Sequence, residues 1–148
     1  MLQSVSDFHN LLLDKFNFEA TNAQDFLMHK LAQFTFETNK NGLFIIKGYA
    51  GTGKTTTISA FVNNLWRVGK KATLLAPTGR AAKVISGYAN RKALTIHKKI
   101  YHPRKNKAGG VNFVLQTNKH TDTLFIVDEA SMISDASTGS KLFENGSV

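Results

Sequence analysis

The spacing of apolar residues predicts two helices at the start of the chain. Residues 4–18 carry apolar side chains at intervals of three and four positions: Val5, Phe8, Leu11 and Leu12. This is the period of an amphipathic helix. A second helix is expected to begin at Thr21, because Thr21 and Gln24 have the spacing of a capping box. Residues 1–40 are therefore interpreted as an N-terminal helical segment.

Beyond residue 40, short apolar runs alternate with segments in which apolar residues have helical spacing. Residues 43–47, 72–76 and 123–127 are short apolar runs, which predict buried strands. Residues 55–68 and 80–88 have helical spacing, and the first of these helices should end at Gly69. Strands alternating with helices predict an α/β domain with a parallel sheet flanked by helices, which we place in residues 41–148.

Three segments have weaker patterns. Residues 95–101 fit either a helix or a strand, and residues 102–110, HPRKNKAGG, predict a basic loop without a core-forming pattern. The polar residues after Glu129 are compatible with a helix.

The stretch GYAGTGKT at residues 48–55 matches a phosphate-binding loop at every fixed position. Glycines allow successive backbone N–H groups to face a phosphate, and the following helix adds the positive end of its dipole. Lys54 is expected to reach the β and γ phosphates and the Thr55 hydroxyl to ligate Mg²⁺. The alternatives are a ligand-free glycine turn and a dinucleotide loop, and Thr56 stands where the latter needs glycine. The expected nucleotide contacts of the loop are Gly48, Ala50, Gly51, Thr52, Gly53, Lys54, Thr55 and Thr56.

Two acidic residues follow the last predicted strand. Asp128 is expected to hold Mg²⁺ through water, and Glu129 to take a proton from the water that attacks the γ phosphate. A pair of acids at a strand end also commonly caps a helix, but here it follows a phosphate loop and a buried strand. Lys54, Asp128 and Glu129 thus predict ATP hydrolysis. A guanine-reading motif is not indicated, because Asp122 falls one position late after Asn118 and Lys119.

Four stretches together resemble the first motifs of the superfamily 1 DNA helicases: GYAGTGKT, LLAPTGRAAKVI, TIHKKIY and LFIVDEASMIS. The similarity is greatest to the RecD-like and Dda-like branch, and it covers residues 21–134. The resemblance implies a RecA-like fold, ATP and Mg²⁺ as cofactors, and movement along single-stranded DNA from 5′ to 3′.

The resemblance also implies roles for particular residues. Gln24 is similar to the adenine-reading glutamine of that family, and its side chain can both donate and accept hydrogen bonds. The capping box is the competing interpretation of Gln24, and the two are compatible in different ligand states. The DNA contacts implied by the resemblance are Pro77, Thr78, Gly79, Arg80, Thr95 and His97. Candidates for stacking on bases are Tyr88, Tyr101 and His102.

The positive charge of the chain is concentrated in one block. The net charge is +9, and residues 67–107 hold 12 of the 19 Lys and Arg residues and no Asp or Glu. A polyanionic partner explains such a block, and single-stranded DNA fits because both DNA-contacting motifs lie within it. A solvated basic surface is the alternative.

Several classes of protein are not indicated. The chain has no cysteine for a disulfide or thiolate site, no secretory signal pattern and no apolar run long enough to span a bilayer. A cytoplasmic protein is expected. The five histidines lack carboxylate partners at metal-ligand spacing, so no zinc site is expected.

The family pattern continues after the Asp-Glu motif with a Gly-Asp…Gln sensor and a second RecA-like domain. The 148 residues are therefore expected to be an N-terminal piece of a helicase, with a gap in the sheet where a further strand belongs. The remaining alternatives are a P-loop ATPase that acts as a switch or DNA-binding adaptor, and a non-catalytic remnant.

Overall fold

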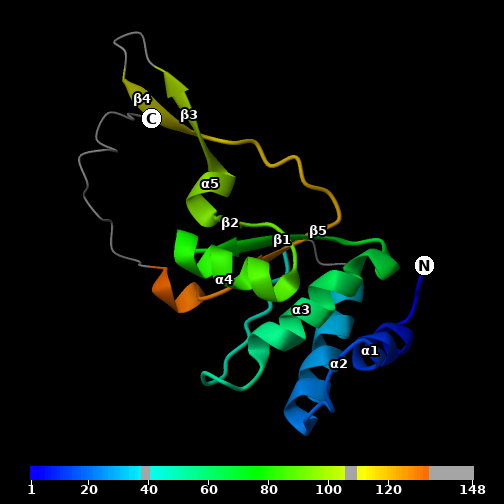
Figure 1. Cartoon of the computed structure of the whole chain (residues 1–148). Coiled ribbons are helices and arrows are strands. Elements are labelled where there is room, and N and C mark those ends of the chain that lie inside the picture. The colour runs from blue at the N-terminus through cyan, green and yellow to red at the C-terminus, as the bar shows by residue number, and fades with distance from the viewer. Residues whose placement is uncertain (38–40, 106–109, 134–148) are drawn as a thin grey trace.

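The computed structural model describes residues 1–37, 41–105 and 110–133. It contains a parallel sheet, helices stacked on one face of that sheet, and a separate β-hairpin (Figure 1). None of the helices within these residues combines the length and apolar character needed to cross a membrane.

The first two helices form as the sequence predicts, with one difference in length. Helix α1 (Val5–Asp14) and helix α2 (Asn22–Phe36) both begin after a residue whose hydroxyl accepts a backbone N–H. Helix α1 ends four residues before the predicted end, because Phe16 donates its N–H to the carbonyl of Leu13 and turns inward. The Phe16 side chain is then 7% exposed.

Helix α3 (Lys54–Asn64) follows the glycine loop and continues into a 3₁₀ turn, η1 (Leu65–Val68). Gly69 ends this turn with a φ of 73°, a left-handed conformation that glycine adopts without steric cost. The predicted helix end at Gly69 is confirmed.

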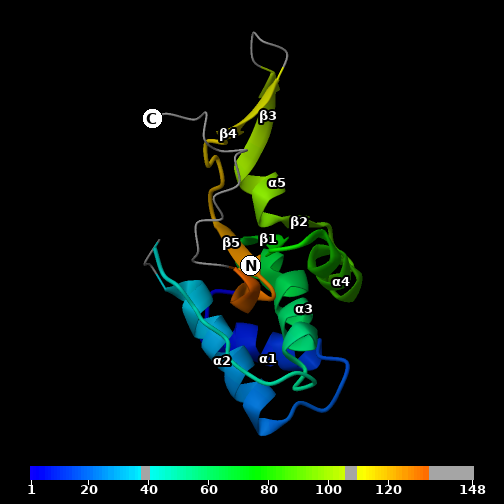
Figure 2. The same ribbon diagram turned by 90° about the vertical axis from the view of Figure 1, so that its left-hand side faces the viewer.

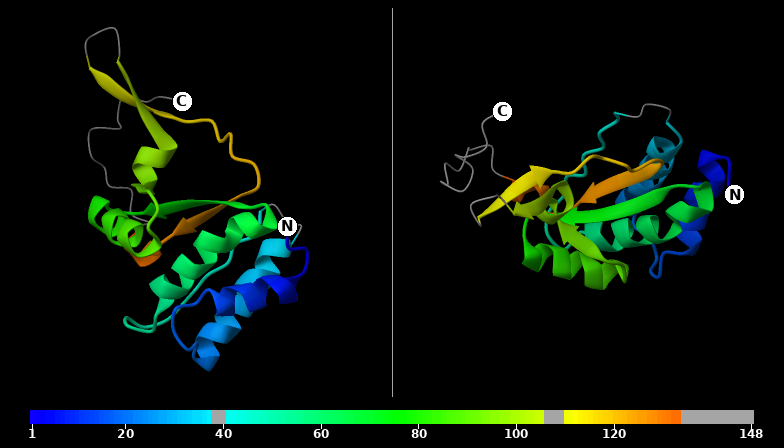
Figure 3. Two further views of the ribbon diagram at one scale, coloured as in Figure 1. Left: turned by 45° about the vertical axis from the view of Figure 1, so that its right-hand side comes forward. Right: turned by 90° about the horizontal axis from the view of Figure 1, so that it is seen from above.

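The main sheet has three parallel strands in the order β2-β1-β5. Strand β1 (Lys71–Ala76) is central, β2 (Ala93–Thr95) and β5 (Thr123–Val127) flank it, and helix α4 (Gly79–Ala89) connects β1 to β2. The predicted α/β class and the strands at 72–76 and 123–127 are confirmed. All three strands point the same way, so their carboxyl ends meet at one edge of the sheet (Figure 3).

The predicted strand at residues 43–47 is wrong. This segment belongs to neither sheet, and its exposure alternates: Leu43 is 82% and Ile45 66% exposed, whereas Phe44 and Ile46 pack against the core. The alternation is that of a strand, but a strand also needs a neighbour for its backbone hydrogen bonds. The described residues provide no such neighbour, and β5 pairs only with β1 within them.

The predicted loop at residues 102–110 is also wrong for its first half. Helix α5 (Ile96–Ile100) leads into strand β3 (Tyr101–Lys105), which pairs antiparallel with β4 (Val111–Leu115). Four of the five residues of β4 are apolar, and this short apolar run is the overlooked signal. The resulting hairpin projects from the body of the molecule (Figure 2). Residues 106–109 of the predicted loop lie outside the described residues, and Gly110 belongs to no strand.

The core lies between the helices and one face of the sheet. Helix α3 lies between the sheet and the pair α1–α2, while α4 lies beside α3 against the same sheet face (Figures 1 and 3). Phe8 of α1 and Phe61 of α3 are at most 1% exposed, and their rings are 6.0 Å apart. The N-terminal helices are thus packed directly onto the helix that starts at the glycine loop. A final 3₁₀ turn, η2 (Ala130–Met132), follows Glu129, and the later residues of the predicted helix lie outside the described residues.

Candidate functional site

The glycine loop is shaped by two left-handed residues. Gly51 and Gly53 have φ angles of 77° and 78°, which residues with a Cβ adopt only at a cost. Gly53 caps the amino end of α3 without a side-chain hydrogen bond. The first backbone N–H groups of α3 therefore remain available at the loop, and a helix start of this kind favours an anion.

The Lys54 ammonium is folded back over the loop. Its Nζ donates to the backbone carbonyls of Gly48 and Tyr49, both at 2.6 Å, and the Thr52 hydroxyl donates to the Tyr49 carbonyl at 2.9 Å. Two neutral carbonyl oxygens thus satisfy a cation on the loop. A phosphate oxygen carries more negative charge than a carbonyl oxygen and would compete for the same ammonium.

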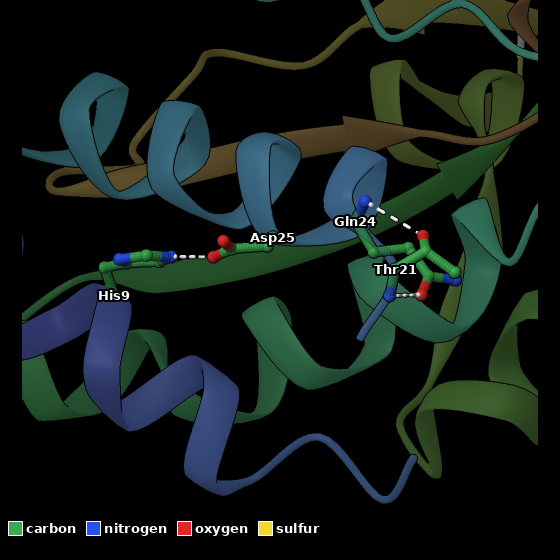
Figure 4. Close-up of polar contacts among 4 residues, drawn as sticks. All are labelled: His9, Thr21, Gln24 and Asp25. Carbon is green, nitrogen blue, oxygen red and sulfur yellow. Dashed lines mark hydrogen bonds and ion pairs between the residues drawn. The ribbon is translucent and has the colours of Figure 1, made fainter. Parts of the chain in front are cut away.

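Gln24 connects helix α2 to the loop. Its Oε1 accepts the Thr21 N–H at 3.0 Å and its own N–H donates to the Thr21 hydroxyl at 3.3 Å, so the capping box is present (Figure 4). The Gln24 Nε2 also donates to the Thr52 carbonyl at 3.3 Å. Backbone groups thus bind both polar atoms of the amide, the oxygen at the cap and the nitrogen at the loop. The capping box is confirmed, and the adenine-reading role of Gln24 stays a prediction.

Gly53 leaves the space into which the end of the Gln24 side chain reaches. A Cβ built on Gly53 would overlap Gln24 Nε2, whereas one built on Gly51 would meet nothing within 4 Å. The two glycines therefore share a backbone conformation but differ in what surrounds them.

A pocket of about 570 Å³ opens between α2 and the loop. We name it the Gln24 pocket; its lining includes Thr21, Gln24, Gly51, Gly53 and Thr56, together with the aromatic pair Phe16 and Phe18. The rings of Phe16 and Phe18 meet edge to face with centroids 6.0 Å apart. Sequence reasoning missed this pair because it included both residues in the first helix, and the signal was an F-x-F stretch just before the capping box.

The start of α2 is also tied to α1. His9 Nε2 and Asp25 Oδ1 are 2.6 Å apart (Figure 4). The centroid of the His9 ring lies 5.1 Å from that of the His29 ring. Asp25 directly follows Gln24, so this contact fixes the helical turn that carries the Gln24 amide.

The acidic pair lies at the carboxyl end of β5. The Asp128 N–H donates to the Leu75 carbonyl at 3.0 Å, and Asp128 Oδ1 accepts the Glu129 N–H at 3.1 Å. Glu129 has a φ of 54°, an uncommon left-handed conformation for a residue with a long side chain. Among the described residues the lining of the Gln24 pocket includes neither acid. The structure therefore brings Gln24 to the loop and Asp128 to the end of β1.

Two candidate DNA-contacting residues are helix caps at the same sheet edge as Asp128. The Thr78 hydroxyl accepts the Ala81 N–H at 3.2 Å, and the Thr95 hydroxyl accepts the Lys98 N–H at 3.1 Å. Thr95 is paired with Ala76, the last residue of β1. Caps and acids are thus grouped at the carboxyl ends of three adjacent strands, the edge at which open α/β sheets bind ligands.

The other predicted contacts are accessible in the same region. Gly79 and Arg80 are exposed next to Thr78, Pro77 is half-buried, and His97 is exposed with its ring 5.1 Å from that of Tyr101. Of the stacking candidates not yet placed, Tyr88 is 64% exposed on α4. His102 is exposed on β3.

The basic block is not one surface. Arg80 lies after the carboxyl end of β1, whereas Lys71 and Arg91 lie at the amino ends of β1 and β2. Arg104 and Lys105 belong to the hairpin. Basic residues that are close together in the sequence therefore lie in separate regions of the fold.

Comparison with known proteins identifies the relatives of this chain. The AAA domain family matches residues 28–144. An ATP-dependent RecD2 DNA helicase of Deinococcus radiodurans is 36% identical over 95 residues, and an uncharacterised protein of Methanocaldococcus jannaschii is 36% identical over 105 residues. Each alignment covers 64% of this chain but only 12% and 9%, respectively, of those proteins. No solved structure matches the chain.

Proposed function

Because the chain belongs to the RecD-like superfamily 1 helicases, a family of P-loop ATPases, we propose that it is the nucleotide-binding part of a motor that moves along single-stranded DNA from 5′ to 3′. The observation that carries the proposal is the contact of Gln24 with the glycine loop. It unites a group able to read a base and a loop able to hold phosphates in one pocket.

The residues present fit ATP. The base enters the Gln24 pocket, where Phe16 and Phe18 supply aromatic surface and the Gln24 amide supplies a donor and an acceptor. The triphosphate lies along the loop formed by Gly48, Ala50, Gly51, Thr52 and Gly53. Lys54 leaves the carbonyls of Gly48 and Tyr49 for the phosphates, and Thr56 lines the entrance.

The residues proposed for hydrolysis come from the start of α3 and the end of β5. Thr55 and Asp128 offer hydroxyl and carboxylate oxygens, the ligand type that Mg²⁺ prefers. The metal supplies charge neutralisation on the phosphates. Glu129 accepts the proton of the attacking water, and its left-handed backbone, φ 54°, sets the direction in which the side chain leaves the chain.

DNA is proposed to bind at the carboxyl ends of β1 and β2. Pro77, Thr78, Gly79 and Arg80 would contact one part of the strand, and Thr95 and His97 the next. The backbone bond from Asp128 to Leu75 joins β5 to the strand that leads to Pro77 and Thr78. A change at the acidic pair therefore has a short covalent and hydrogen-bonded route to the DNA contacts. A second RecA-like domain of the same protein is proposed to close on the nucleotide and drive the movement.

The central test compares Lys54→Ala with Lys47→Ala. Lys54 contacts the loop, whereas Lys47 is exposed one residue before it. We expect Lys54→Ala to lower DNA-stimulated ATP hydrolysis at least about a hundredfold, because the charge that stabilises the transferred phosphate is lost. Lys47→Ala should retain hydrolysis, and both variants should retain most single-stranded DNA binding.

Two results would contradict parts of the proposal. If ATP hydrolysis persists in Lys54→Ala, the assignment of residues 48–55 as a phosphate-binding loop is wrong. A full-length protein that hydrolyses ATP on DNA but fails to displace a strand from 5′-tailed duplexes would instead act as a switch or DNA-binding adaptor.

A further inference from the structure

A second basic region lies at the amino ends of the strands, opposite to the proposed DNA edge. It lines a pocket of about 370 Å³ whose walls include Trp66, Lys70, Lys71, Arg91 and His120. Lys71 begins β1, and Arg91 lies two residues before β2. We call it the Trp66 pocket. Neither the phosphate loop nor the caps at Thr78 and Thr95 belong to its lining.

Trp66 supplies an aromatic surface in this pocket. It is the only tryptophan of the chain, and it is 58% exposed. The Arg67 guanidinium lies over its ring, 4.1 Å from the centroid. The stacked guanidinium restrains the exposed indole and covers one face of its ring, which leaves the opposite face for a base. An exposed, immobilised indole is the kind of group on which nucleic-acid bases stack.

The basic residues of the pocket differ in how many of their donors already bind other groups of the protein. Lys70 pairs with Asp122 at 3.0 Å, and His120 contacts Lys99 at 2.6 Å. One Arg91 N–H donates to the Val62 carbonyl at 2.8 Å, which positions the guanidinium and leaves its other donors for a ligand. The Lys71 side chain is exposed. Lys71 and Arg91 are therefore the groups able to contact phosphates.

We propose that the Trp66 pocket binds a segment of single-stranded nucleic acid. One base stacks on Trp66, and adjacent backbone phosphates contact Lys71 and Arg91. A bare inorganic anion would use the cations but not the indole, whereas a single strand uses both. The site is separate from the carboxyl edge, so it would hold a second part of the same strand or a second strand. It does not depend on nucleotide hydrolysis.

The single tryptophan makes the proposal directly testable. The intrinsic fluorescence of Trp66 is measured while the protein, without ATP, is titrated with an oligothymidylate. We expect quenching with an affinity that falls with salt, as expected for displaced counterions. An abasic oligomer of the same length should bind at this site roughly fivefold more weakly or worse, because it lacks the stacked base. Thymidine monophosphate should quench far more weakly than the oligomer.

Two charge-removing variants separate this site from a general effect of the basic block. Lys71→Ala should flatten the salt slope of quenching by about 0.7, the contribution of one phosphate contact on a single strand. Lys83→Ala removes an exposed lysine of α4 that is not part of the pocket lining, and should leave the slope unchanged. Since both side chains are exposed, neither substitution should affect folding.

Four outcomes would overturn the proposal. They are absence of quenching, equal quenching by abasic and thymidine oligomers, equal affinity for thymidine monophosphate, and equal effects of Lys71→Ala and Lys83→Ala. A failure of the proposed DNA contacts at the carboxyl edge gives a different result. In that case Thr78→Ala leaves total DNA binding unchanged, while quenching of Trp66 persists.

Discussion

At the scale of single residues, two glycines of the loop allow base recognition to be separated from phosphate binding. Gly51→Ala and Gly53→Ala should each destabilise the loop by about 1 kcal/mol or more, because both impose a left-handed backbone on alanine. Only the Gly53 substitution also displaces the Gln24 amide. We therefore expect Gly51→Ala to weaken the binding of ATP and of GTP equally. Gly53→Ala should weaken the binding of both and also reduce the preference for ATP over GTP.

The measurement is the ratio of dissociation constants for ATP and GTP in the two variants. Urea unfolding provides the control that both retain a folded core. Equal ATP-to-GTP ratios in Gly51→Ala and Gly53→Ala would show that Gln24 acts only as a helix cap. Comparing these two variants thus distinguishes base recognition by Gln24 from its role as a helix cap.

At the scale of elements, helix α2 is capped by the residue that positions Gln24. Thr21→Ala removes the hydroxyl that accepts the Gln24 N–H, and Ser4→Ala removes the equivalent cap of α1. Each should lower the free energy of unfolding by about 1 kcal/mol. Only Thr21→Ala should also change ATP affinity, because Ser4 caps a helix that carries no proposed nucleotide contact.

Unfolding in urea and nucleotide titration together check this prediction. An equal loss of ATP affinity in Ser4→Ala would mean that general destabilisation, and not the position of Gln24, governs binding. The contact between His9 and Asp25 acts on the same turn of α2. It depends on the His9 side chain and not on the Ser4 hydroxyl, so Ser4→Ala keeps both partners of this contact and remains the control.

At the scale of the whole molecule, the sequence predicts those elements whose signals are local. The apolar run before Asp128, the helical spacing after the glycine loop and the helix stop at Gly69 each depend on neighbouring residues. These were predicted correctly. The capping box at Thr21 was also correct, because its two partners are three residues apart.

The elements that sequence reasoning missed depend on which other segment each of them contacts. Residues 43–47 have strand-like alternation but no neighbouring strand among the described residues. The segment from His102 contains Pro103 and three basic residues, yet it forms a strand because Val111–Leu115 pairs with it. Likewise, Phe16 lines the Gln24 pocket only because the chain turns before α2. The apolar residues of β4 and the F-x-F stretch are visible in the sequence, but the segments that they contact in the fold are not.

The exposed apolar surface of the whole molecule leads to the last prediction. Leu43 and Ile45 are 82% and 66% exposed beside the loop, and Phe125 is 42% exposed on the uncovered face of β5. Unpaired extended segments and apolar sheet faces associate with other copies of the chain. We expect the 148-residue chain to self-associate at concentrations on the order of micromolar, as measured by sedimentation velocity.

A charge placed on the unpaired segment should reduce this association. Ile45→Lys adds a charge to an exposed position of that segment, and Val84→Lys adds one to a 50% exposed position of α4. Each should change the free energy of unfolding by no more than about 0.5 kcal/mol, because neither side chain is buried. Ile45→Lys should shift the sedimentation profile toward monomer, and Val84→Lys should not. A wild-type chain that stays monomeric and melts cooperatively at high temperature would contradict the prediction. Equal effects of the two lysines would assign association to net charge instead of the segment at 43–47, since charge repulsion alone does not depend on where the lysine is placed.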